Sequence, residues 1–226
     1  EYLLTGDKLP LNHLIELMHG NVYNYHELAL DYAQACQWIE AEQVLSISEV
    51  AEELKKNSPL TGYYIGYFKF GQGLMGEAIS CFQQAEMIDS SYCFPNRLED
   101  VLVLNLAKSL NPTGARAFYY LGNLYYDKRQ YALAKENWEL SIRLDSTFPT
   151  AWRNLALYYY NKEKNQKKAI EYMESAFHLD ETDARILMEL DQLYKVIGKS
   201  HAERLEFLDK YISLIDLRDD LVLEYI

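Results

Sequence analysis

FYYLGNLYYDKRQYALAKENWELSIRLD (118–145) and WRNLALYYYNKEKNQKKAIEYMESAFHLD (152–180) follow each other in this chain and share one pattern. Each begins with an aromatic residue, followed by Leu three residues later, a small residue next to it, and Tyr three residues after that. Further along, Ala is followed by a bulky residue after four positions and by a small one after three more. Self-similarity at a spacing of about 34 residues predicts stacked pairs of helices.

Two earlier segments follow the same template. Counted from the first residue of each repeat, small residues recur at positions 8, 20 and 27, and bulky residues at positions 4, 7, 11 and 24. Helix axes that approach within about 8–10 Å require small side chains where they cross, which explains the first set. The predicted repeats are 22–55, 59–92, 115–148 and 149–183, the last with one extra residue in its central loop.

This pattern resembles that of the tetratricopeptide-repeat family, which has Trp, Leu-Gly, Tyr, Ala, Phe, Ala and Pro at these positions. The resemblance covers roughly two thirds of the chain and is strongest in the third and fourth repeats. It implies an all-α fold, a right-handed α-solenoid in which the first helix of each pair lines a concave face. It also implies a scaffold that binds a protein or peptide without catalysing a reaction.

Three segments depart from the repeat. Residues 93–114 interrupt the period and read as a single extra helix, the second helix of a pair whose first helix is missing. Residues 184–217 form a degenerate repeat with charge where small residues are expected, and residues 10–20 read as a short leading helix. We expect one solenoid domain over 1–226 that is a fragment of a longer protein.

Composition narrows the function classes. The formal charge of -12 argues against nucleic acid and against an anionic membrane surface as ligands, because both need clustered Lys and Arg. Cys36, Cys81 and Cys93 lack metal-ligand spacing, and the five histidines are scattered singly. No catalytic or cofactor-binding motif is recognisable, so we expect neither an enzyme nor a cofactor. No segment resembles a signal peptide or a transmembrane helix; the compartment stays open, with the cytoplasm favoured.

The candidate binding residues are those that the resemblance places on the concave face, at positions 2, 5, 6, 9 and 12 of the first helices. Aromatic side chains, Arg and Asn dominate there, and such side chains dominate binding hot spots. The aromatic residues at positions 5 and 12 could instead pack on the next repeat. The predicted binding residues are Tyr63, Tyr67, Arg116, Tyr119, Asn123, Tyr126, Arg153, Asn154, Tyr160 and Arg185.

The chain does not fit the family members that grip a C-terminal carboxylate. Asn123, Asn154 and Arg185 are in register for such a clamp, but Tyr119 and Glu189 replace two of its three cations. A peptide of another kind, or another domain of the same chain, is therefore expected in the groove. The oligomeric state cannot be predicted.

A second, narrower resemblance leads to an alternative function. The runs LGNLYYDKRQYALAKENWELSIRLDSTFPTAWRNLALYYYNK, RILMELDQLYK and LRDDL look like the repeat region of large bacterial proteins with an N-terminal mutarotase-like β-sandwich. This implies an accessory repeat domain of a carbohydrate-related protein, which docks its own partner domain or a glycan.

Overall fold

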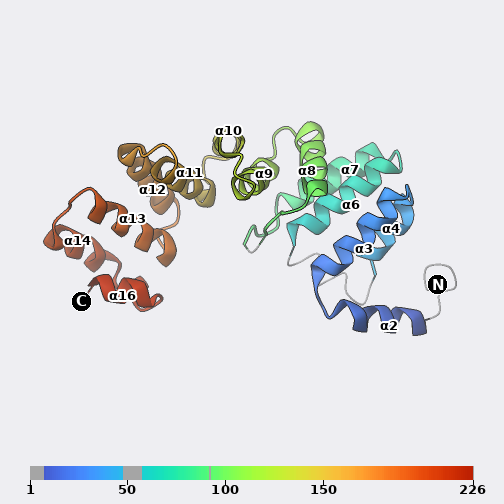
Figure 1. The fold of residues 1–226 in the computed structure, drawn as a ribbon, viewed down its shortest axis with the longest axis horizontal. Helices are drawn as coiled ribbons and strands as arrows, with labels where there is room; N and C mark the ends of the chain where they lie inside the picture. Colours follow the sequence, from blue (N-terminus) through green and yellow to red (C-terminus); the bar gives the residue numbers. More distant parts are fainter. Residues whose placement is uncertain (1–7, 48–57, 92, 226) are drawn as a thin grey trace. The chain divides into compact units, whose positions relative to one another are not determined.

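The computed structural model describes residues 8–47, 58–91 and 93–225, and within these ranges every regular element is a helix (Figure 1). Most helices have 11 to 14 residues, about three to four turns, and short loops join them. In chain order they are α2 (Lys8–Met18), α3 (Val22–Gln34), α4 (Trp38–Leu45), α6 (Pro59–Gly71), α7 (Met75–Ala85), α8 (Leu98–Leu110), α9 (Arg116–Asp127), α10 (Tyr131–Leu144), α11 (Pro149–Asn161), α12 (Gln166–Leu179), α13 (Ala184–Val196), α14 (His201–Leu208), α15 (Ile212–Ile215) and α16 (Asp219–Tyr225).

The internal contacts divide the chain into two compact units, Glu1–Leu124 and Tyr125–Ile226, here called unit 1 and unit 2. The boundary falls inside α9, and each unit is described by itself. Unit 1 is built on the helix pairs α3/α4 and α6/α7, and unit 2 on α11/α12 and the helices that follow it. Both are stacks of tetratricopeptide-type helix pairs, so the predicted all-α solenoid is confirmed. A single domain over 1–226 stays a prediction.

The small residues lie where the helices of a pair cross. Ala29, Ala41, Ala78, Ala134 and Ala156 are all fully buried, as the pattern requires. Gly66 shows why: a Cβ added there would lie 2.5 Å from the Phe82 ring on the partner helix, closer than atoms can pack. The regular spacing of small residues thus sets the distance between paired helices.

The turn inside each helix pair adopts the same conformation. One residue per turn has a left-handed backbone, with φ between 54° and 86°, and it occupies position 15 of the repeat, or position 16 where the extra residue precedes it. A left-handed residue ends the first helix and reverses the chain within a few residues, and glycine tolerates it best. The five residues are Cys36, Gly73, Arg129, Lys164 and Gly198.

Helix α8 is the single extra helix predicted at 93–114. It packs on α6 and α7 and buries Asp100, Val103, Leu104 and Ala107, which are positions 20, 23, 24 and 27 of a second helix. Arg97 is the N-cap residue, and the Asp100 carboxylate accepts hydrogen bonds from the backbone N–H groups of Asn96 and Arg97.

In the degenerate repeat, a buried ion pair occupies a place where the other repeats have a small residue. Asp191 stands at position 8, where other repeats have Ala or Gly, and it accepts two hydrogen bonds from the Arg204 guanidinium on α14. Both residues are buried. Glu203, at position 20 of this repeat, is exposed and caps α14 by accepting from the N–H of Ser200 at 2.8 Å. Helix α14 therefore presents Arg204 and Leu208 to the core instead.

The leading helix predicted at 10–20 begins slightly earlier than the sequence predicted. Helix α2 occupies Lys8–Met18, whereas the prediction was 10–20. It ends where His19 and Gly20 both take positive φ, at 52° and 66°. Residues 48–55, the end of the first predicted repeat, lie outside the described residues.

Candidate functional site

The central contact of the candidate site joins the first helices of two successive repeats in unit 2. The Arg153 guanidinium on α11 donates two hydrogen bonds to the Glu189 carboxylate on α13, one of them Nε to Oε2 at 2.6 Å. The two side chains are 15% and 16% exposed, so the pair is reachable but partly shielded from water. Bidentate Arg–carboxylate pairs of this kind fix both side chains. Arg153 and Glu189 thus join α11 to α13 through two directed hydrogen bonds.

Two further predicted residues lie next to this pair. The Asn154 side-chain oxygen accepts a hydrogen bond from Arg153 Nη1 at 3.3 Å. Arg185 stands one turn before Glu189 on α13 and is exposed, with its guanidinium 3.4 Å from the Asp183 carboxylate. Residues four apart on a helix share a face. We call Arg153, Asn154, Arg185 and Glu189 the Arg153 surface.

The Arg153 surface has little spare positive charge. Glu189 neutralises Arg153, and Asp183 faces Arg185 and also caps α13 by accepting from the Arg185 N–H at 2.8 Å. An isolated anionic ligand would have to displace a carboxylate that is already bound. This charge balance agrees with the expectation that the chain is no clamp for a C-terminal carboxylate.

The two predicted tyrosines of unit 2 differ in surroundings. Tyr126 on α9 is half-buried against two aromatic rings of α10, those of Tyr131 and Trp138, with centroids 5.2 and 5.4 Å away. The ammonium of Lys162 lies 5.4 Å from the Tyr126 ring centroid, a cation–π distance. Tyr160 on α11 is half-buried. The Tyr126 ring thus packs within its own unit, which favours the packing alternative for this residue.

In unit 1 the predicted residue Tyr63 is fully buried, so it cannot belong to an accessible binding surface. Its hydroxyl donates to Glu86 at 2.8 Å, and its ring lies 5.9 Å from that of Tyr120 on α9. Burial and the nearby Glu86 carboxylate raise the pKa of the Tyr63 hydroxyl well above its ordinary value. The physical reason is its place in the repeat: position 5 faces the first helix of the next repeat, as it does for Arg153.

Tyr119, also at position 5, is buried with its ring 5.3 Å from that of Tyr120. It too packs in the core instead of facing a ligand. The other predicted residues of unit 1 are half-buried, and Tyr67 meets Trp38 edge-on at 5.6 Å. They are Tyr67, Arg116 and Asn123.

Sequence reasoning missed two carboxylates that organise these contacts. Glu86 accepts hydrogen bonds from the backbone N–H groups of Arg116 and Ala117 at 2.8 and 3.2 Å, so it caps α9 from outside that helix. Glu189 was noted as the residue that replaces one cation of a carboxylate clamp, but its pairing with Arg153 was not predicted. Its position one repeat after Arg153, with both at the inter-repeat contact, is the sequence signal that could have identified the pair.

Among the described residues, no group of three or more His, Cys, Asp or Glu side chains could hold a metal ion. Burial raises the pKa of the Cys93 thiol to about 12, which disfavours the reactive thiolate. The described helices include none that is both long and apolar enough to cross a bilayer.

Comparison with known proteins finds one curated protein that is similar over part of the chain, and several similar solved structures. No protein-family profile matches the chain. A curated relative, protein-L-isoaspartate O-methyltransferase of Dictyoglomus turgidum, is 37% identical over 87 residues, which is 35% of this chain. The matched part spans 39% of that relative's length, so the match does not transfer the relative's activity to this chain.

Similar solved structures include tetratricopeptide-repeat proteins. MamA (41-end) of Desulfovibrio magneticus is 22% identical, with 88% of this chain and 97% of that chain covered and a TM-score of 0.46. A thermophilic tetratricopeptide-repeat protein of Thermus thermophilus is 15% identical, covering 90% and 96%, also at 0.46. The C-terminal part of a repeat-containing protein of Cytophaga hutchinsonii is 18% identical, covering 88% and 67%, at 0.42. At these TM-scores, the argument for the fold stays with the helix packing of the chain itself.

Proposed function

We propose that this chain is a non-catalytic scaffold that binds a protein or peptide segment through the first helices of its repeats. The observation that carries the proposal is the Arg153 surface in unit 2. It combines two arginines, an amide and a carboxylate, all positioned by neighbouring first helices. Arginine and amide groups give directional hydrogen bonds to extended peptides at modest entropic cost.

The charge balance of the surface indicates the kind of segment it suits. Glu189 is bound to Arg153, and the side chain of Arg185 is exposed. A segment that places a carboxylate near Arg185 and a donor near Glu189 would match both signs of charge. The partner is therefore expected to be a polar peptide of mixed charge and not a uniformly acidic tail.

Affinity capture tests this assignment with the wild-type chain and an Asn154→Ala/Arg185→Ala variant as baits. Arg153 itself is a poor choice, because removing it leaves the Glu189 carboxylate without its partner and destabilises α13. The control is Lys167→Ala, which removes one positive charge from an exposed site on α12. A protein that is retained by the wild type and by the control, but lost from the double variant, supports the proposal.

The opposite outcome of this experiment would refute the assignment. Retention of the same proteins by all three baits would refute the Arg153 surface as a binding site. The accessory-domain alternative, in which the repeats dock another domain of the same polypeptide, would then be the next hypothesis to test. That alternative, and the mutarotase-like neighbour on which it rests, stay predictions that the reading frame of the whole protein can test.

A further inference from the structure

The single helix α8 has large apolar residues at two outward-facing positions, whereas each of four other second helices has at most one there. Positions 18 and 22 of a second helix face outward, and in α8 they are Leu98 and Leu102. In the same register, none of the second helices α4, α7, α10 and α12 has a large apolar residue at both positions. The corresponding pairs are Ile39 and Gln43 in α4, Gly76 and Ser80 in α7, Ala132 and Glu136 in α10, and Lys167 and Glu171 in α12.

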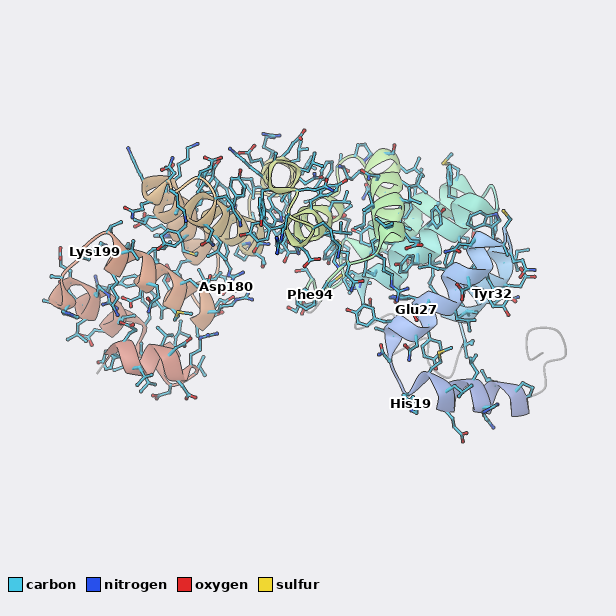
Figure 2. All side chains as sticks on the ribbon, in the orientation of Figure 1. His19, Glu27, Tyr32, Phe94, Asp180 and Lys199 are labelled. Atoms are coloured by element: carbon cyan, nitrogen blue, oxygen red, sulfur yellow. The ribbon has the colours of Figure 1, made fainter. Side chains whose placement is uncertain are left out.

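These leucines are open to solvent. Leu98 is 80% exposed and Leu102 62%, and they stand one helical turn apart, so they form one stripe. Phe94, 61% exposed, lies on the loop that leads into α8, where Figure 2 labels it. Single exposed leucines are common on protein surfaces, but adjacent large apolar residues mark sites of interaction. We call Leu98 and Leu102 the α8 stripe, and Phe94 is a further exposed apolar residue on the loop before it.

The surroundings of the α8 stripe are acidic. Glu27 and Asp31 stand one turn apart on the exposed face of α3, and Glu99 follows Leu98 on α8. The start of α8 is tied to this face of α3, because the Arg97 guanidinium binds Glu27 and the Gln34 amide donates to Glu99. Arg97 is already paired, so the rim of the stripe keeps an excess of negative charge.

We propose that the α8 stripe docks an amphipathic segment of another protein, one with two or three large apolar residues on one face and Lys or Arg beside them. The stripe supplies the apolar contact and the acidic rim supplies charge complementarity. A second copy of this chain fits poorly, because each copy carries a formal charge of -12 and would bring acidic rims together. The α8 stripe shares no residue with the Arg153 surface.

Fluorescence anisotropy with a labelled synthetic peptide of leucine and lysine, about four helical turns long, tests the proposal. The test variant is Leu98→Gln/Leu102→Gln. The matched control is Leu17→Gln/Ile39→Gln, which removes two aliphatic side chains of similar exposure, 59% and 58%, from α2 and α4. The peptide is expected to bind the test variant at least tenfold more weakly than the wild type, about 1.4 kcal/mol, and the control unchanged.

A second pair of measurements tests the charge. A peptide of leucine and glutamate should bind at least tenfold more weakly than the lysine peptide, and added salt should weaken the lysine peptide's binding. Equal affinity of the lysine peptide for wild type, test variant and control would overturn the proposal, as would equal binding of both peptides. A wild-type dimer that dissociates in Leu98→Gln/Leu102→Gln, seen by analytical ultracentrifugation, would overturn it by showing that a second copy covers the stripe. Loss of helicity in the test variant by circular dichroism would assign the leucines a structural role instead.

Discussion

The buried ion pair at the C-terminal end of unit 2 makes an asymmetric prediction about stability. Asp191 is fully buried, and the partner that the structure gives its carboxylate is the Arg204 guanidinium. Arg204 has another partner as well, because its Nη2 donates to Glu224 on α16 at 2.6 Å. Removing the arginine should therefore cost much more than removing the aspartate, although the same pair is broken in both variants.

The magnitudes follow from what each change leaves behind. Arg204→Met leaves a carboxylate buried without a counter-charge, which costs about 3–5 kcal/mol. Asp191→Ala leaves Arg204 bonded to Glu224 and restores the small residue usual at position 8, so we expect a cost of about 1–3 kcal/mol. The double variant Asp191→Ala/Arg204→Met buries no charge and should be more stable than Arg204→Met alone by about 2 kcal/mol.

Hydrogen exchange followed by mass spectrometry is the appropriate assay. Solenoids unfold in a graded manner from their ends, so a global melt would mix the response of α13–α16 with that of the other helices. The free energy of local opening in α13–α16 should fall in the order wild type, Asp191→Ala, Arg204→Met. Equal losses in the two single variants, or a double variant whose loss equals their sum, would refute the reasoning.

Three further predictions concern pH and packing. Hydrogen bonds from Lys195 and neighbouring donors lower the pKa of the Glu224 carboxyl from 4.5 to about 2. The protection of α16 in hydrogen exchange should therefore be complete above pH 4.5 and decline as the pH falls towards 2. Constant protection over that range would contradict this prediction. Burial lowers the pKa of the His26 imidazole from 6.5 to about 3, so the unfolded state takes up a proton at a higher pH than the folded state does. The free energy of unfolding should therefore fall as the pH drops below 6.5. NMR should show no titration of His26 between pH 5 and 8. Gly66→Leu should overpack the α6–α7 crossing and cost about 1–3 kcal/mol in urea unfolding, whereas Gly76→Leu, with open space around it, serves as the control without overpacking.

Several side chains show where sequence reasoning succeeded and where it stopped. The position of α8 was predicted, because its small residue Ala107 keeps the spacing of the repeats. The surroundings of the side chain at position 5 of each repeat were not predicted. Tyr63 and Arg153 occupy the same position, yet one is buried in the core and the other forms a partly exposed ion pair. Which of these happens depends on the side chain that the next first helix presents there, and no local pattern encodes that.

The sequence by itself determined the architecture. The spacing of Ala, Gly and aromatic residues is local information, repeated in each helix pair, and it dictates which helix faces meet and how closely. The tertiary structure alone decided which polar groups pair. The bonds from Arg153 to Glu189 and from Arg204 to Asp191 join residues on different helices, and each depends on the rotation of both helices about their axes. A shift of one residue in α14 exchanges Glu203 for Arg204 at the core. Buried charges must be paired, so the partner across the interface, and not the repeat pattern, selects the register.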